Sequence, residues 1–191
     1  KELISKPKYG FINCHAGILP NYRGGSPLNW QIINNETHFG ITVIKMNSKI
    51  DRGNIVAEKR FKLKARYDIN DLHTIANNNF PKLVQLSIYK ILKGYKGTKQ
   101  NKIKSKYYPQ RTIKNSKIIL KKITFKNLKL MVRALQSPYP NVFFKHNNKK
   151  ISINNLSLSN LHIRPGEIIK KKDIIHFGCK DKTVKSVMNL I

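Results

Sequence analysis

The sequence predicts an α/β protein whose C-terminal part is a small all-β domain. A β-branched run at residues 39–46 and an amphipathic stretch at residues 71–93 indicate a buried strand and a long helix. Short alternating segments, evenly spaced between residues 142 and 188, indicate a small open β-barrel. With 191 residues, the chain is long enough for one large domain or two small ones.

The first half of the chain has the signals of three strands and a short helix ahead of the long helix. Ser26 is a candidate N-cap and Pro27 suits the first helical position, so a helix is expected to begin there. Asn34 and Asn35 form a stop and turn signal. The expected elements are a strand at 11–15, a helix at 26–34, and strands at 39–46 and 54–63.

The long helix is predicted from apolar residues that recur near one stripe of residues 71–93. Pro81 is expected to kink this helix, because proline removes a backbone hydrogen bond and crowds the preceding turn. The residues of the stripe are Leu72, Ile75, Ala76, Leu83, Leu86 and Ile91.

After the long helix the regular pattern is lost in a tract of Gly, Lys, Gln and Asn. We therefore expect a first domain at 1–96, a linker at 97–117 and a second domain at 118–191. The elements expected in the second domain are a helix at 124–134 and strands at 142–145, 150–153, 156–158, 174–179 and 183–188.

The chain is strongly basic, with 38 Lys and Arg against 9 Asp and Glu and a net charge of +29. Such a charge attracts phosphate, in RNA or in a nucleotide-linked substrate. The excess is mostly Lys, however, and it accompanies abundant Ile and Asn along the whole chain. This favours compositional bias, so the charge alone does not argue for nucleic acid.

Cys14 and Cys179 are the two cysteines, far apart in sequence, which favours reduced thiols and a cytoplasmic protein. Cys14 is expected on the buried face of its strand, as an apolar residue rather than a nucleophile. No apolar run approaches the ~20 residues that span a bilayer, and no signal-peptide pattern is present, so no membrane partner is expected.

The polar residues best suited to catalysis lie around the first strand. Asn13 and His15 are two apart on a strand and therefore share a face. Leu19-Pro20 breaks the strand, and the loop at 23–27 cannot be regular structure. Its glycines and prolines allow backbone to approach a ligand. Asp51 adds a carboxylate from a separate loop at 48–53. An amide, an imidazole and a carboxylate together predict a catalytic site.

Three blocks of sequence carry a resemblance to a known family. They are Asn13-x-His15, then Ile18-Leu19-Pro20-x-x-Arg23-Gly24-x-x-Pro27, then Asp51-x-Gly53. In order and spacing they resemble the formyltransferases that use 10-formyltetrahydrofolate, which include methionyl-tRNA, glycinamide ribonucleotide and sugar-nucleotide enzymes. The second half, with Arg133-Ala134-Leu135 and Pro138-Tyr139-Pro140, resembles the open-barrel (OB-like) C-terminal domain of some members.

The resemblance implies the C-terminal part of a Rossmann-like formyltransferase domain, followed by the OB-like domain. Similar proteins begin with a further βαβ region that carries part of the folate pocket, so an N-terminal part of the catalytic domain is expected to be missing. One departure is Gly17, where methionyl-tRNA formyltransferases usually carry Ser. A non-catalytic binding module is the alternative from another functional class.

By resemblance, Asn13, His15 and Asp51 are the catalytic residues, acting without a metal. An Asn amide or an imidazolium N–H can stabilise negative charge on the formyl oxygen, and a carboxylate can orient the imidazole or relay a proton. The resemblance further implies that 10-formyltetrahydrofolate is bound by Ile18, Leu19, Pro20, Ile50 and Gly53, and the acceptor by Arg23 and Gly24. Arg23 could instead anchor its own loop.

Two acceptors fit the resemblance, an amino-sugar nucleotide and Met-tRNA. The segments Pro27-Leu28-Asn29-Trp30 and Tyr108-Pro109-Gln110-Arg111-Thr112 look closer to formyltransferases of 4-amino-4-deoxy sugars. Methionyl-tRNA formyltransferases more often read Leu-Asp-Thr-Gly-Asp where this chain has Ile50-Asp51-Arg52-Gly53-Asn54. The basic charge and the barrel domain favour tRNA. The sugar is preferred, and a homodimer stays open.

Overall fold

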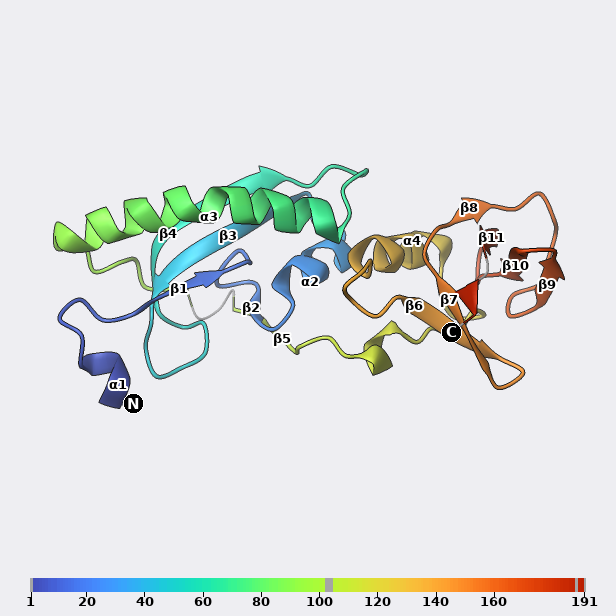
Figure 1. The fold of residues 1–191 in the computed structure, drawn as a ribbon, viewed down its shortest axis with the longest axis horizontal. Coiled ribbons are helices and arrows are strands. Elements are labelled where there is room, and N and C mark those ends of the chain that lie inside the picture. Colours follow the sequence, from blue (N-terminus) through green and yellow to red (C-terminus); the bar gives the residue numbers. More distant parts are fainter. Residues whose placement is uncertain (1, 102–104, 188, 191) are drawn as a thin grey trace. The chain divides into compact units, whose positions relative to one another are not determined.

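The computed structural model describes residues 2–101, 105–187 and 189–190 (Figure 1). The chain divides into two compact units, Lys1–Gln110 and Arg111–Ile191. The division falls inside the segment expected to be a linker, residues 97–117.

The first unit contains a three-stranded sheet in the order β1-β3-β4, with both pairings antiparallel. The strands are β1 (Ile12–His15), β3 (His38–Lys45) and β4 (Asn54–Lys62), each within one residue of its expected range at either end. A short helix α1 (Glu2–Ser5) precedes them. An α/β unit is therefore confirmed, whereas parallel Rossmann-like pairing is not found among these three strands.

Helix α3 (Ile69–Leu92) packs on β3 and β4, which Figure 1 shows running along it. It begins two residues earlier than predicted, because Asp68 and Asp71 form a capping box at its N-terminus. Leu86 was expected in the buried stripe but is 45% exposed. Ser87 takes its place, since it follows Leu83 by one helical turn and its hydroxyl donates to the Leu83 carbonyl.

Helix α2 (Pro27–Ile33) begins after Ser26, which occupies the expected N-cap position with a left-handed φ of 50°. Ser26 makes no side-chain capping hydrogen bond in that position. The helix packs on β3. The loop before it pairs with the segment expected to be a linker, because β2 (Arg23–Gly24) and β5 (Tyr107–Tyr108) form a parallel pair.

The predicted linker is thus partly built into the first unit. Thr98 forms an antiparallel bridge with Ile55, with N–O distances of 2.8 and 2.9 Å. Tyr108 stacks on Tyr22, with ring centroids 5.0 Å apart. The polar composition of the segment concealed these contacts, since backbone pairing needs no apolar alternation.

The second unit consists of helical segments and two small antiparallel sheets, in the orders β8-β11-β10-β9 and β12-β7-β6. Its elements are the 3₁₀ helix η1 (Ile113–Ser116), α4 (Phe125–Ala134), β6 (Val142–His146), β7 (Lys149–Ile153), β8 (Ser157–Leu158), β9 (Ile168–Lys171), β10 (Ile174–Gly178), β11 (Thr183–Val187) and β12 (Asn189–Leu190). Phe144 and Phe177 meet in its core, with centroids 5.5 Å apart. Strands β9 and β12 were not predicted. The sequence of β9, Ile-Ile-Lys-Lys, does not alternate between apolar and polar residues. Three of its four residues are exposed, and only Ile168 is partly buried.

Over the described ranges, no helix combines the length and the apolar character needed to cross a membrane.

The prediction that Cys14 is buried is wrong, because its side chain is exposed. Cys14 pairs with Val43 and lies on the face opposite Asn13 and His15, as expected. However, β1 is the end strand of the described sheet and α3 packs on β3 and β4, so Cys14 is left uncovered. Cys179, by contrast, is buried.

We expect the two thiols to differ widely in reactivity. Burial raises the pKa of Cys179 to about 12, so at pH 8 this buried side chain is a neutral thiol. Partial desolvation also raises the pKa of Cys14, but its side chain is exposed and can react. Titration of the native protein with a chromogenic disulfide should show one fast thiol, which the Cys14→Ser variant lacks. Two fast thiols would contradict the packing of the second unit.

Candidate active site

Asn13 and His15 lie on the same face of β1, where they pair with Ile44 and Thr42 of β3. His15 is only 6% exposed. Its burial follows from its position next to Thr42, a buried residue whose hydroxyl donates to the Gly17 carbonyl at 2.7 Å. The start of the glycine-rich loop is thus folded back over this end of the strand.

Both ring nitrogens of His15 have partners. Nε2 lies 2.5 Å from the carbonyl oxygen of Tyr22, and Nδ1 lies 3.6 Å from Oδ1 of Asp51. A carbonyl only accepts hydrogen bonds, so Nε2 carries a proton in this arrangement. Nδ1 of the same ring faces the Asp51 carboxylate, so the imidazole is held between a backbone carbonyl and a carboxylate.

Asp51 is held in its loop by a backbone donor. Its Oδ2 accepts a hydrogen bond of 2.8 Å from the backbone N–H of Gly24, and its side chain is 10% exposed. Asp51 also has a left-handed φ of 50°, which is unfavourable for a residue with a Cβ. One carboxylate therefore joins His15, on β1, to the loop that carries Gly24.

A cavity of about 250 Å³ opens beside this pair and is lined by Asn13 and Asp51. Its other lining residues are Ile44, Met46, Asn47, Ser48, Lys49 and Ile50. Apolar walls with a few convergent polar groups are typical of a small-molecule or cofactor site. Among the residues that the structure describes, no group of three His, Cys, Asp or Glu side chains could hold a metal ion.

The residues expected to bind the folate are divided between two places. Ile50 is 68% exposed at the cavity that contains Asn13, and Gly53 is buried at the end of the same loop. Ile18 lines a different cavity of about 330 Å³, together with Tyr22 and Glu36. Leu19 is a core residue, and a cis peptide bond links it to Pro20.

Arg23 is buried and directed at Gln100, with Nε and Nη2 donating to Oε1 at 3.0 and 2.6 Å. Burial is the main reason that the pKa of Arg23 is lowered, and nearby Arg52 adds to it. This geometry favours the alternative in which Arg23 anchors its loop, rather than the expected contact with the acceptor. Gly24 supplies the N–H that binds Asp51.

Two residues that contact the candidate site residues were not predicted from the sequence, Tyr22 and Gln100. Tyr22 acts through its backbone carbonyl, for which a side-chain pattern gives no signal. Its phenol donates to Glu36 at 2.5 Å, and burial, reinforced by Glu36, raises the pKa of Tyr22. Gln100 lies in the polar tract expected to be a linker, where nothing in the sequence distinguishes it from its neighbours.

Gly17 fits closely beneath the imidazole. A Cβ on Gly17 would lie 2.9 Å from Nε2 of His15, 2.9 Å from Cβ of Pro27 and 3.0 Å from the Tyr22 carbonyl oxygen. A serine at this position would therefore have to displace the ring or the loop. The glycine and the hydrogen bond from His15 to Tyr22 occur together in this chain.

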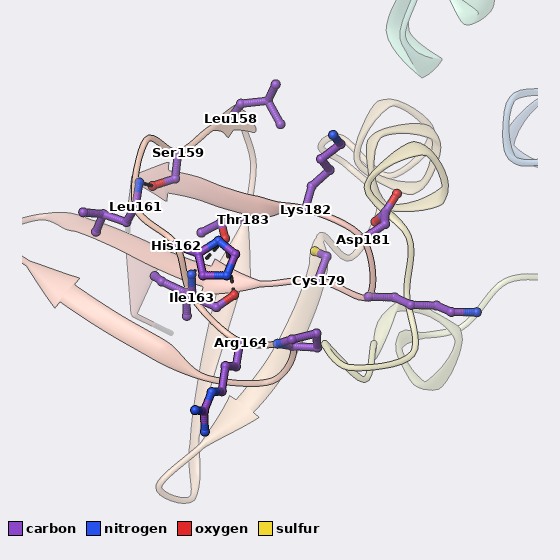
Figure 2. A pocket seen from close by; sticks show the side chains of 12 residues that line it. Leu158, Ser159, Leu161, His162, Ile163, Arg164, Cys179, Asp181, Lys182 and Thr183 are labelled. Atoms are coloured by element: carbon purple, nitrogen blue, oxygen red, sulfur yellow. Dashed lines mark hydrogen bonds between the residues drawn. The ribbon is translucent and has the colours of Figure 1, made fainter.

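A larger cavity of about 560 Å³ lies in the second unit and shares no residue with the one beside Asn13. Figure 2 shows His162, Arg164, Lys182 and Cys179 among the residues that line it. Asp181 on its rim accepts a hydrogen bond of 2.8 Å from the backbone N–H of Phe125, so it caps α4. Its charged lining is thus partly structural.

Comparison with known proteins gives related sequences over almost the whole chain. The chain is 31% identical to the bifunctional polymyxin resistance protein ArnA of Wigglesworthia glossinidia brevipalpis, covering 97% of this chain and 28% of that protein. It is 27% identical to a methionyl-tRNA formyltransferase of Caldanaerobacter subterraneus subsp. tengcongensis, covering 97% of this chain and 60% of that protein. The chain therefore spans less than two thirds of the length of these relatives.

Among solved structures, an N-formyltransferase from Helicobacter canadensis, in complex with folinic acid and dTDP-3-aminofucose, is similar with a TM-score of 0.69 and 25% identity. The similarity covers 94% of this chain and 66% of that one. A variant of HypX from Aquifex aeolicus shares the fold, with a TM-score of 0.71 and 20% identity over 92% of this chain and 32% of that one.

Two family models match the chain in succession. The model described as "Formyl transferase" matches residues 1–84, and the one described as "Formyl transferase, C-terminal domain" matches residues 112–187. The resemblance seen in the sequence is thereby confirmed: the chain belongs to the formyltransferase family.

Proposed function

We propose that the protein transfers a formyl group from 10-formyltetrahydrofolate to the primary amine of a nucleotide-linked amino sugar. The observation that carries this proposal is the carboxylate of Asp51, which contacts His15 Nδ1 and the Gly24 N–H beside a cavity that also contains Asn13. The cavity walls of Ile44, Met46 and Ile50 suit a flat heterocycle such as a pterin.

In this proposal, the chemistry of the site centres on an oxygen that becomes negative. The amine nitrogen attacks the formyl carbon, and the carbon–oxygen double bond opens to an oxyanion. The bond to the folate nitrogen then breaks as the carbonyl re-forms, and that nitrogen takes up a proton so that tetrahydrofolate leaves. The Asn13 amide and an N–H of His15 are the donors for that oxygen. To reach it with Nε2, His15 must exchange its hydrogen bond to the Tyr22 carbonyl for one to the substrate.

Asp51 has two tasks in this proposal. It orients the His15 ring through Nδ1, which lies 3.6 Å from its Oδ1. It is also the nearest base for the proton that the attacking amine must lose, through an intervening water. No metal is required, because hydrogen bonds alone serve both the oxyanion and the proton.

The amino-sugar acceptor is supported by the sequence around Trp30 and by one of the solved structures. The Helicobacter canadensis enzyme was solved with dTDP-3-aminofucose. Methionyl-tRNA is the alternative acceptor, supported by the Caldanaerobacter enzyme and by the net charge of +29. A non-catalytic binding module is a further alternative, and it predicts a folded protein that transfers no formyl group.

Several finer features belong to the same proposal. The first unit is the C-terminal part of a Rossmann-like domain, and the two small sheets of the second unit form an OB-like barrel. The protein works in the cytoplasm, without a membrane partner, and a homodimer is compatible with it. Ile18, Leu19, Pro20, Ile50 and Gly53 contribute to folate binding, and Gly24 shapes the acceptor side, while Arg23 anchors its loop through Gln100.

The proposal is tested by incubating the intact protein with 10-formyltetrahydrofolate and each acceptor in turn. We expect formylated amino-sugar nucleotide, detected by mass spectrometry as a gain of one CO unit, and no product with Met-tRNA. Product from Met-tRNA alone would replace the preferred acceptor by the alternative. A properly folded protein with no product from either acceptor would favour the binding module.

A further inference from the structure

The side chain of Gln100 connects the buried Arg23 with the loop that carries Asp51. Its Nε2 donates to the backbone carbonyls of Asp51, at 2.8 Å, and Gly53, at 2.7 Å. Its Oε1 accepts both hydrogen bonds of the Arg23 guanidinium, at 3.0 and 2.6 Å. One amide thus has four hydrogen bonds, all to groups in or next to the proposed site.

The chemistry of these partners requires an amide at this position. A guanidinium only donates and a backbone carbonyl only accepts, so the side chain between them must accept on one side and donate on the other. Glutamate could pair with Arg23 but would face the two carbonyl oxygens with a third oxygen. Lysine or arginine could bind the carbonyls but would face a cation.

The backbone next to Gln100 is itself fixed to the sheet. Thr98, two residues earlier, forms its bridge with Ile55 at the start of β4. The amide therefore acts from a supported position. It spans the Asp51–Gly53 turn from both ends.

The Asp51 conformation needs such support. A left-handed φ of 50° is unfavourable for a residue with a Cβ, so an untethered loop would relax away from it. Relaxation at Asp51 would move its carboxylate away from His15 Nδ1 and from the Gly24 N–H. Gln100 holds the carbonyl of the same residue whose carboxylate contacts His15.

We propose that Gln100 is the positioning residue that sets Asp51 against His15, with Arg23 acting through Gln100 and not on substrate. This inference rests on the proposed function for its catalytic consequence. Its structural content, the placement of Asp51 by the Gln100 amide, can be measured separately.

The decisive variant is Gln100→Glu, which keeps the shape and the pairing with Arg23 but removes the two N–H donors. We expect kcat for formyl transfer to fall about 10²-fold, as for a misplaced catalytic group, with smaller changes in KM for either substrate. Gln100→Met, which also leaves Arg23 without its acceptor, should lose as much activity and be less stable than Gln100→Glu. Gln85→Glu, at an exposed position of α3, is the control for charge and should leave kcat unchanged.

A readout independent of activity is the backbone amide proton of Gly24, which donates to Asp51. In ¹⁵N-labelled protein its resonance should move upfield in Gln100→Glu and stay unchanged in Gln85→Glu. If the resonance moves but the parent protein transfers no formyl group, the placement of Asp51 stands and the proposed function fails. Unchanged kcat and an unchanged Gly24 resonance in Gln100→Glu would overturn the inference and leave Gln100 as a partner of Arg23 only.

Discussion

Replacement of His15 by Ala should lower kcat for formyl transfer by about 10²–10⁴-fold. The substitution removes the proposed donor to the formyl oxygen and the ring that contacts Asp51, and each kind of contribution has this magnitude in other enzymes. The loss should appear in single-turnover rates at saturating substrate, because the imidazole is proposed to act in the transition state rather than in binding.

The control for this experiment is His146→Ala, an exposed histidine of the second unit. It should retain the full rate, so that a general effect of removing an imidazole is excluded. Circular dichroism should show that both variants are folded. Normal turnover by His15→Ala would contradict the proposed catalytic role of His15 for either acceptor.

The second large effect is expected from Gly53→Ala. A Cβ on Gly53 would overlap the backbone carbonyl of Lys45, and it would lie 3.3 Å from Cα of Met46. Both neighbours are main-chain atoms, so no side-chain rotation relieves the overlap, and the loop carrying Asp51 must shift. We expect a loss of about 10²-fold in kcat together with destabilisation of about 1–3 kcal/mol.

Gly94→Ala is the matched control, because a Cβ there meets nothing within 4 Å. Its φ of +86° still makes alanine unfavourable by about 1 kcal/mol, while the site is untouched. Thermal unfolding and kcat measured on both variants separate the two effects. Equal activity in Gly53→Ala and Gly94→Ala would show that the Asp51 loop tolerates displacement.

The parts of the fold with a strong period could be predicted from the sequence. Strands β3 and β4 and helix α3 were expected because β-branched and amphipathic patterns report burial directly. Strand β9 was missed because three of its four residues are exposed. Pairing of β5 with β2 was missed because it depends on backbone groups and on an encounter between distant segments.

The candidate site, like the fold, could be predicted from the sequence only in part. The shared orientation of Asn13 and His15 followed from the two-residue period of a strand. The approach of Asp51 came only from the family resemblance, since no local rule joins residues 36 positions apart. Nothing in the sequence pointed to Gln100, because the role of an amide in a polar tract depends on the partners that the tertiary structure brings close to it.

The return of the chain to the first unit has a consequence for how this protein could be recombined with its relatives. A chimera joined at residue 96 would exchange Gln100, the Thr98 bridge and the tyrosine that stacks on Tyr22 along with the foreign C-terminal half. A crossover after Gln110 would keep all of these groups with their native partners. Chimeras are therefore best joined after β5 (Tyr107–Tyr108), and not where helix α3 ends.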